Sequence, residues 1–268
     1  MIESPYELDV DTALVARGDG RFAVHVTDRW NIGAAPNGGY LGVITTRAIA
    51  AMLPQPDPFS VTSHYLAVAR PGPAEVVTEV VRLGKGHSTA EARLVQGGRE
   101  IVRTLAVFGD LGTLEGPTDV RCRLPPLPAP EDCEEGRPAP SLPVIAERLD
   151  VFMPKGAASW MSGIRSEVPE LGGWIRLRDG RAPDPISLVF FADAFPPPVL
   201  NLGAVQTPWV PTLEMTVHVR ARPAPGLLRA WFRTRALMHG YLEEDGEIWD
   251  STGTLVAMSR QLARVHRG

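Results

Sequence analysis

Cysteine, runs of positive charge and long apolar stretches are all scarce in this chain of 268 residues. Only Cys122 and Cys133 occur, without a CxxC or Cys/His spacing, so we expect two free thiols. No apolar run approaches the ~18 residues of a membrane span, and the N-terminus lacks the basic and apolar regions of a signal peptide. These absences predict a globular protein of the cytoplasm with no membrane span.

The charge balance disfavours one class of partner. The chain has 27 basic and 31 acidic residues, a net charge of -4, and no cluster of Lys and Arg. Proteins that bind nucleic acid or anionic membrane surfaces usually carry such clusters. A small neutral or anionic ligand therefore fits better, and an apolar fraction of 44% is enough for an ordinary core.

Several active-site motifs are missing as well. No Gly-x-Ser-x-Gly elbow occurs, which disfavours serine-hydrolase chemistry. The segment Gly84-Lys-Gly-His-Ser-Thr89 lacks the spacing of a phosphate loop and is expected to be a hairpin turn. The six histidines show no metal-binding spacing. We expect neither a metal nor a redox cofactor.

The first half of the chain predicts one core helix followed by a meander of antiparallel strands. Apolar residues recur at three and four positions over 40–53, and Pro54 ends this pattern. Turn signals separate the β-rich runs that follow. Four strands are expected after the helix, at about 60–70, 75–83, 87–96 and 100–108, and one or two before it, at about 5–15 and 22–29.

The second half repeats this order after a connector rich in proline and acid at 111–143. Pro71 and Pro223 are separated by 223 − 71 = 152 residues, His87 and His239 by 239 − 87 = 152. The last strands match at 254 − 100 = 154 and the helical segments, through Asn37 and Asp193, at 193 − 37 = 156. Further strands are expected at about 146–153 and 173–178. We predict an N-terminal unit at 1–110 and a C-terminal unit at 144–268, each a curled sheet around one helix.

Asp193 is the strongest candidate for chemistry, because it lies in the apolar stretch 186–195, immediately before Pro196, Pro197 and Pro198. A buried carboxylate is costly unless it has polar partners or a function that needs a perturbed acid. The alternative is an exposed acid at a broken helix end, since three prolines make the backbone irregular. From composition alone, both interpretations stay open.

Three segments resemble the acyl-CoA thioesterase II family and its thioesterase-like relatives: Thr27-Asp-Arg-Trp-Asn-Ile-Gly-Ala-Ala-Pro-Asn-Gly-Gly-Tyr40, Tyr65-Leu-Ala-Val-Ala-Arg-Pro-Gly72 and Phe191-Ala-Asp-Ala-Phe195. The resemblance covers nearly the whole chain except the connector. It implies an α+β double hotdog, in which two curled antiparallel sheets each wrap one core helix. It also implies a homodimer or higher homo-oligomer.

The resemblance further implies a catalytic set of Asp193, Thr212 and Gln261, which hold and activate a water without a cofactor. A carboxylate acts as general base on that water, while a hydroxyl and an amide orient it toward a thioester. Asn37, Gly38, Gly39 and Tyr40 open the first helix and are candidates for substrate binding, since a helix N-terminus offers free N–H groups to an oxyanion. The alternative, a plain turn and helix start, stays open. Ala106 or Val107 stands at the position matching Gln261 in the first half, so one site per chain is expected.

The expected function is hydrolysis of an acyl-CoA thioester, with the acyl group in an apolar channel beside the first helix. Two alternatives remain open. One is an acyl-CoA or lipid binder that has kept the cavity without catalysis. The other is a hydratase-type hotdog enzyme acting on enoyl-CoA, which would need an Asp/His pair; no histidine closely follows Asp193.

Overall fold

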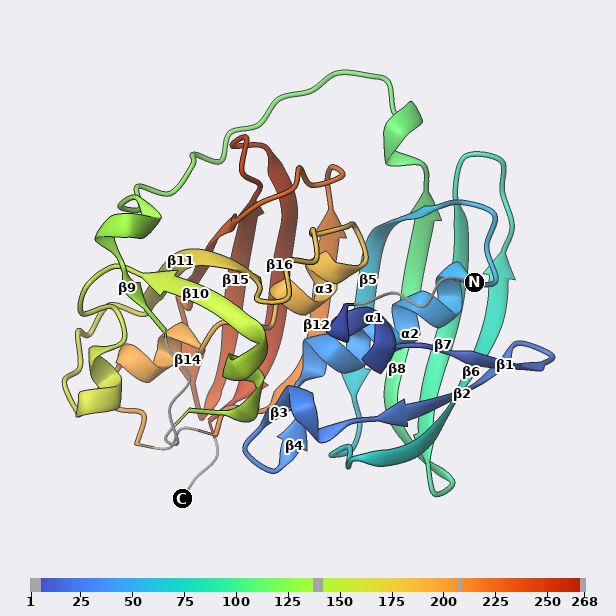
Figure 1. The fold of residues 1–268 in the computed structure, drawn as a ribbon, viewed down its shortest axis with the longest axis horizontal. Helices are drawn as coiled ribbons and strands as arrows, with labels where there is room; N and C mark the ends of the chain where they lie inside the picture. Colours follow the sequence, from blue (N-terminus) through green and yellow to red (C-terminus); the bar gives the residue numbers. More distant parts are fainter. Residues whose placement is uncertain (1–5, 137–141, 207–208, 266–268) are drawn as a thin grey trace.

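The computed structural model describes residues 6–136, 142–206 and 209–265, and its ribbon is shown in Figure 1. The N-terminal half forms α1 (Glu7–Asp11), β1 (Val15–Gly18), β2 (Arg21–Val26), η1 (Asp28–Trp30), β3 (Asn31–Ile32), β4 (Ala35–Pro36), α2 (Gly38–Ala50), β5 (Asp57–Tyr65), β6 (Gly72–Arg82), β7 (Ser88–Gln96) and β8 (Arg99–Gly109). The expected core helix is α2, and the four strands expected after it are β5 to β8.

The remaining elements follow in the order η2 (Leu111–Thr113), η3 (Pro130–Asp132), β9 (Glu134–Glu135), η4 (Val144–Arg148), β10 (Leu149–Met153), η5 (Ser159–Ser162), β11 (Glu170–Leu177), α3 (Ser187–Phe191), η6 (Pro198–Asn201), β12 (Thr212–Val219), β13 (Leu228–Arg233), β14 (Leu237–Met238), β15 (Tyr241–Trp249) and β16 (Leu255–Arg264). The strands expected near 146–153 and 173–178 are therefore β10 and β11.

The two halves meet edge to edge in one antiparallel sheet of 14 strands, ordered β1-β2-β6-β7-β8-β5-β12-β16-β15-β13-β11-β10-β9, with β14 beside β15. The order within the second half mirrors the order within the first. At the junction Thr62 of β5 pairs with Thr216 of β12, and their hydroxyl oxygens lie 3.0 Å apart. Their separation of 154 residues lies within the offsets of 152 to 156 seen in the sequence, as expected for two similar units related by a pseudo-twofold axis.

Helix α2 is the core helix of the first half, and most of its residues are buried against the sheet and α3. The side chain of Asn37 caps it by accepting the N–H of Tyr40. Gly39 and Gly42 allow close packing against α3. A Cβ at Gly39 would lie 2.9 Å from the carbonyl oxygen of Phe190, and one at Gly42 would lie 2.9 Å from Val189 Cγ1. Larger residues there would force the two helices apart.

The second-half helix is shorter than the apolar run that predicted it. Helix α3 ends at Phe191, so Asp193 lies just beyond the helix rather than on it. Beyond Phe191 the backbone tightens, since the Asp193 N–H donates to the carbonyl of Phe190 at 3.0 Å. Pro196 prevents any later continuation, because it has no N–H to donate to the carbonyl of Ala192 and disfavours a helical conformation at Phe195. The chain continues into η6, which begins at Pro198.

The strand expected at 5–15 is wrong. Residues 7–11 form the short helix α1, and only Leu8 of this helix is buried. Its apolar neighbour Val10 is 54% exposed, so the apparent alternation of apolar residues does not mark a strand face. The strand β1 begins later, at Val15, and pairs with β2.

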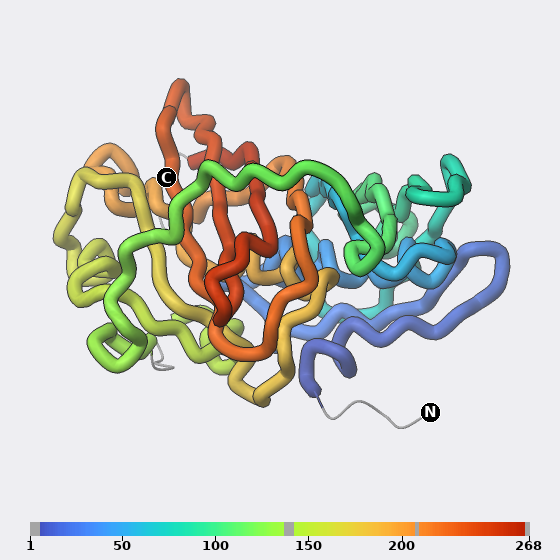
Figure 2. The backbone as a smooth tube through the Cα atoms, turned by 90° about the horizontal axis from the view of Figure 1, so that it is seen from above, coloured from blue at the N-terminus to red at the C-terminus, as the bar shows by residue number. Residues whose placement is uncertain are grey.

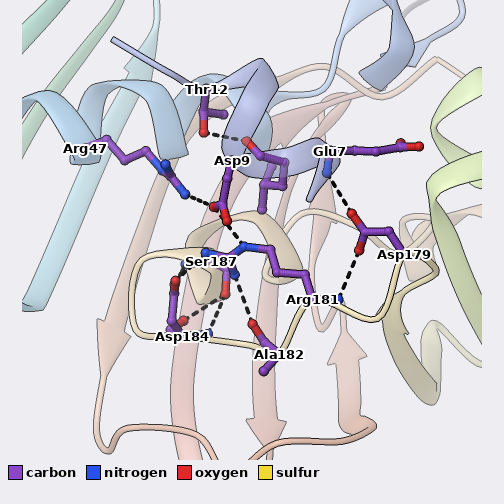
Figure 3. Close-up of polar contacts among 10 residues, drawn as sticks. Glu7, Asp9, Thr12, Arg47, Asp179, Arg181, Ala182, Asp184 and Ser187 are labelled. Atoms are coloured by element: carbon purple, nitrogen blue, oxygen red, sulfur yellow. Dashed lines mark hydrogen bonds and ion pairs between the residues drawn. The ribbon is translucent and has the colours of Figure 1, made fainter. Parts of the chain in front are cut away.

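Ion pairs connect α1 to both halves of the molecule (Figure 3). The carboxylate of Asp9 accepts hydrogen bonds from Arg47 of α2 and, at 2.9 Å, from Nε of Arg181, which precedes α3. Arg181 is only 8% exposed and also donates to Asp184 and to the carbonyl of Ala182. Because each charge has partners, this network replaces the hydration that burial removes.

The connector after β8 crosses over the molecule from the first half to the second, as the green segment of Figures 1 and 2 shows. Residues 137–141 of the predicted connector lie outside the described residues, and the boundaries 1–110, 111–143 and 144–268 stay a prediction. Carbonyls of Pro125 and Pro128 accept hydrogen bonds from Arg229 and Trp174, which tie the connector to the second half. Cys122 and Cys133 are both free, as expected. Among the described residues, no helix has the length and hydropathy needed to cross a bilayer.

Candidate active site

Asp193 lies where the segment after α3 meets the N-terminus of α2. Its Oδ2 accepts hydrogen bonds of 2.8 Å from both Asn37 Nδ2 and the Gly39 N–H. The same amide nitrogen of Asn37 donates to the backbone carbonyl of Asp193 at 2.9 Å. Gly38 allows this approach, because a Cβ there would lie 3.0 Å from Asp193 Oδ2. The two residues matched by the sequence repeat therefore touch each other in space.

These surroundings tune the basicity of Asp193. Burial raises its pKa from the ordinary 3.8 to about 6, while hydrogen bonds from Gly39, Asn37 and Gly38 act in the opposite direction. The positive end of α2 also favours the ionised form. A carboxylate with this pKa is mostly ionised near neutral pH, yet it is a stronger base than an exposed aspartate.

Thr212 and Gln261 are in direct contact with each other. The Thr212 hydroxyl donates to Gln261 Oε1 at 2.7 Å, and Gln261 Nε2 donates to Glu244 Oε1 at 2.7 Å. Burial raises the pKa of Glu244 to about 8, a net value to which the nearby charges of Asp193 and Asp245 also contribute and which the hydrogen bond from Gln261 opposes. Asp193 thus lies within electrostatic reach of this chain of hydrogen bonds.

Strand register explains why Gln261 faces the interior. Glu244, Gln261, Met215, Ser63 and Thr104 occupy one row across five neighbouring strands, and all are buried. Side chains in one row of a sheet point to the same face.

The matching position in the first half shows how the halves have diverged. Subtracting the pseudo-twofold separation gives 244 − 154 = 90, and Ala90 pairs there with Ala106. The polar pair of Glu244 and Gln261 thus has an apolar counterpart, so the geometry favours one site per chain.

The predicted substrate-binding residues have other contacts in this structure. Asn37 and the Gly39 N–H hold Asp193, and Gly38 is packed against it. Tyr40 is fully buried; its hydroxyl accepts the Thr27 N–H and donates to the carbonyl of Asp11. The side chain of Tyr40 therefore belongs to the core, and a direct contact of these four residues with substrate stays a prediction without geometric support.

Glu244 was not predicted from the sequence. It lies in the acidic run 243–245, which reads as a solvated turn or edge. The signal that could have found it is the alternation along β15, in which Leu242, Glu244, Gly246 and Ile248 are all buried. An acid on the buried face of a strand that pairs with Gln261 would have been a candidate.

The described residues offer neither a histidine partner nor a metal centre. The five described histidines are all exposed, and the sixth, His266, lies outside the described residues. No group of three or more His, Cys, Asp or Glu side chains among the described residues is arranged to hold a metal ion.

A surface hollow of about 480 Å³ lies between α1, β1 and β2, and it is lined by residues such as Val10, His25 and Pro73. None of the predicted site residues lines it. The hollow therefore gives no support to the predicted acyl channel.

The comparisons with known proteins agree with this architecture. Residues 26–109 match the family model of the acyl-CoA thioesterase N-terminal domain, and residues 123–265 match that of the C-terminal domain. A thioesterase II candidate from Thermobifida fusca YX is 32% identical, with a TM-score of 0.88 and coverage of 98% of this chain and 99% of that chain.

Two further relatives extend the similarity. A conserved protein of unknown function with a hotdog fold from Alicyclobacillus acidocaldarius is 24% identical, with a TM-score of 0.87 and coverage of 99% and 100% of the two chains. A thioesterase-like protein of Talaromyces wortmannii is 26% identical over 91% of this chain and 87% of its own length. These matches confirm the α+β double hotdog and the thioester-hydrolase class. The chain belongs to the acyl-CoA thioesterase family.

Proposed function

We propose that this enzyme hydrolyses an acyl-CoA thioester to the free acid and CoA by direct attack of water. Asp193 acts as general base, and Thr212 and Gln261 orient the water. The observation that carries this proposal is the environment of Asp193, a carboxylate fixed on the N-terminus of α2 with a pKa raised to about 6. Such a group is ionised at neutral pH and still basic enough to take a proton.

The proposed roles follow from the hydrogen bonds on each side of the site. The hydrogen bonds from Asn37 and Gly39 both end on Asp193 Oδ2, so we assign Oδ1 as the oxygen that receives a proton from water. The water oxygen attacks the carbonyl carbon, the tetrahedral intermediate collapses, and the C–S bond breaks. The CoA thiolate takes up the proton that Asp193 received from water, which restores the base. In this mechanism Asn37, Gly38 and Gly39 act by fixing the base, which supplies much of the orientation that the reaction needs.

A hydratase that uses an Asp/His pair is less consistent with the geometry. Every described histidine is exposed, whereas the carboxylate of Asp193 bonds groups at the N-terminus of α2. A binder without catalysis would have no need for a carboxylate whose burial raises its pKa to about 6. Hydrolysis is therefore the preferred function.

Thiol release from short, medium and long acyl-CoAs tests this proposal. Asp193→Asn should lower kcat by at least about 100-fold, because asparagine cannot act as a base. Asp119→Asn, at an exposed position of the connector, is the matched control and should leave kcat unchanged. Turnover by Asp193→Asn at the wild-type rate would contradict the proposed base. Tight acyl-CoA binding without wild-type turnover would favour the binder.

Other aspects of the proposal stay predictions from the sequence and the family resemblance. They are an apolar acyl channel beside α2, a cytoplasmic location, a role in lipid metabolism, and a homodimer or higher homo-oligomer. Analytical ultracentrifugation of the purified chain measures the last of these directly.

A further inference from the structure

Glu244 is a buried acid that has no role in the mechanism proposed above. It is 5% exposed, its Oε1 accepts the hydrogen bond from Gln261, and its Oε2 is buried without a hydrogen-bond partner among the described residues. Burying a carboxyl group with one oxygen unpaired costs stability. A group with this cost is expected to have a role.

The fold itself does not require a polar group at this point. Ala90 occupies the position related to Glu244 by the pseudo-twofold axis, and it pairs with Ala106 on β8 as Glu244 pairs with Gln261 on β16. The same sheet geometry is therefore built once with two alanines and once with an acid and an amide. Since two alanines fill this position in the first half, packing of the core does not require an acid in the second half. A role in the active site explains Glu244 better.

Glu244 determines which end of the Gln261 amide faces Thr212. Glu244 Oε1 accepts the hydrogen bond from Gln261 Nε2, so the NH₂ group of Gln261 turns toward Glu244 and its oxygen turns toward Thr212. A proton on Oε2 does not alter this, because Oε1 remains an acceptor. Thr212 then donates its single hydroxyl proton to Gln261, as the 2.7 Å bond shows, and keeps its oxygen lone pairs for another donor.

We propose that Glu244 is a positioning residue, which fixes the Gln261 amide so that Thr212 presents an acceptor to the attacking water. One hydrogen of that water is accepted by Asp193 and the other by Thr212, which leaves an oxygen lone pair directed at the thioester carbon. With the amide reversed, the Thr212 proton would point at the water and compete for that lone pair. This inference rests on the proposed hydrolysis by Asp193-activated water.

Three variants test the role of Glu244. Glu244→Met has a similar volume but removes the oxygen that accepts the hydrogen bond from Gln261. It should lower kcat about 10–100-fold, with little change in KM, because the Gln261 amide loses the group that orients it. Its melting temperature should not fall, because an apolar side chain suits a buried site. Glu244→Gln keeps an acceptor oxygen and should restore at least about tenfold of the lost kcat relative to Glu244→Met. Glu247→Met is the matched control, three residues along β15 on the opposite face of the sheet.

A double-mutant cycle with Gln261→Leu identifies the route of the effect. If Glu244 acts through the amide, Glu244→Met should cause no further loss of kcat in the Gln261→Leu background. An equal loss in both backgrounds would overturn the proposal, as would wild-type kcat in Glu244→Met or a fall in melting temperature that accompanies the loss.

Failure of the proposed function would appear elsewhere. It would be seen as absent wild-type turnover or as full activity of Asp193→Asn, before any Glu244 variant is compared. Either result would remove the basis of the positioning role as well.

Discussion

Replacing Glu244 by glutamine should remove a pH dependence from the stability of the fold. Glu244 has an ordinary pKa of 4.5, which burial raises to about 8 in the folded protein. Below pH 4.5 both folded and unfolded chains carry the proton. Between these pH values the folded chain retains a proton that the unfolded chain has lost, so stability decreases as pH rises, and the loss is complete above about pH 8.

The size of this effect follows from the two pKa values. Their difference, at about 1.4 kcal/mol per pH unit, corresponds to a loss on the order of 5 kcal/mol across the whole range. Glutamine has nearly the same shape and does not titrate in this range. The free energy of unfolding of wild type relative to Glu244→Gln should therefore fall by several kcal/mol between acid and alkaline pH.

Urea unfolding of both proteins at about pH 5 and about pH 9 measures this difference, and Glu247→Gln serves as the control for a half-buried acid on the opposite face. The titration of Asp193 is common to all three proteins and largely cancels in the comparison. Parallel pH dependences of wild type and Glu244→Gln would show that the buried acid is not perturbed, and would refute this reasoning.

Two further predictions concern the groups around the site. Asn37→Ala removes a hydrogen bond that lowers the pKa of Asp193. Because the base must be ionised, the acid limb of the pH profile of kcat/KM should move above pH 6. An unchanged acid limb would contradict this role of Asn37. Arg181→Met should lower the free energy of unfolding by about 3 kcal/mol, because it removes a buried partner of the Asp9 carboxylate. Arg176→Met removes an ion pair whose arginine is exposed, and should lower the free energy of unfolding by less than about 1 kcal/mol in the same urea titration. Equal losses would contradict the structural importance of the ion pairs around α1.

Sequence periodicity was sufficient for most of the fold. The helix α2 and the strands β5 to β8 follow from apolar spacing and turn residues, because each of these elements buries one face against the same core. The error at α1 has a local cause: five residues with one buried leucine carry too few positions to separate a helix from a strand. Pro196 sets only an upper limit for α3 near residue 195, whereas the helix ends at Phe191.

The site was only partly predictable. Asp193 was visible as an acid among aromatic residues, and the family resemblance added Thr212 and Gln261. Glu244 and Arg181 were missed, because their partners lie on other elements and are determined by sheet register and helix docking. The oxyanion role expected for Asn37 and Gly39 illustrates the same limit, since the sequence did not reveal that Asp193 already accepts their N–H groups.

A single-turnover reaction in ¹⁸O-labelled water tests the central claim most directly. If Asp193 activates water as a general base, the free acid from the first turnover contains one ¹⁸O atom and the protein gains none. If Asp193 instead attacks the thioester as a nucleophile, hydrolysis of the resulting anhydride at its acyl carbon would still label the product. Hydrolysis at the Asp193 carbon would place ¹⁸O in Asp193 and leave the first product unlabelled. Trapping the reaction with hydroxylamine addresses the remaining case, because attack on an anhydride can leave a hydroxamate on Asp193, whereas the direct reaction of hydroxylamine with the substrate thioester leaves the protein unmodified. Our account predicts labelled acid, unlabelled protein and no hydroxamate on Asp193; an ¹⁸O label or a hydroxamate on Asp193 would contradict it.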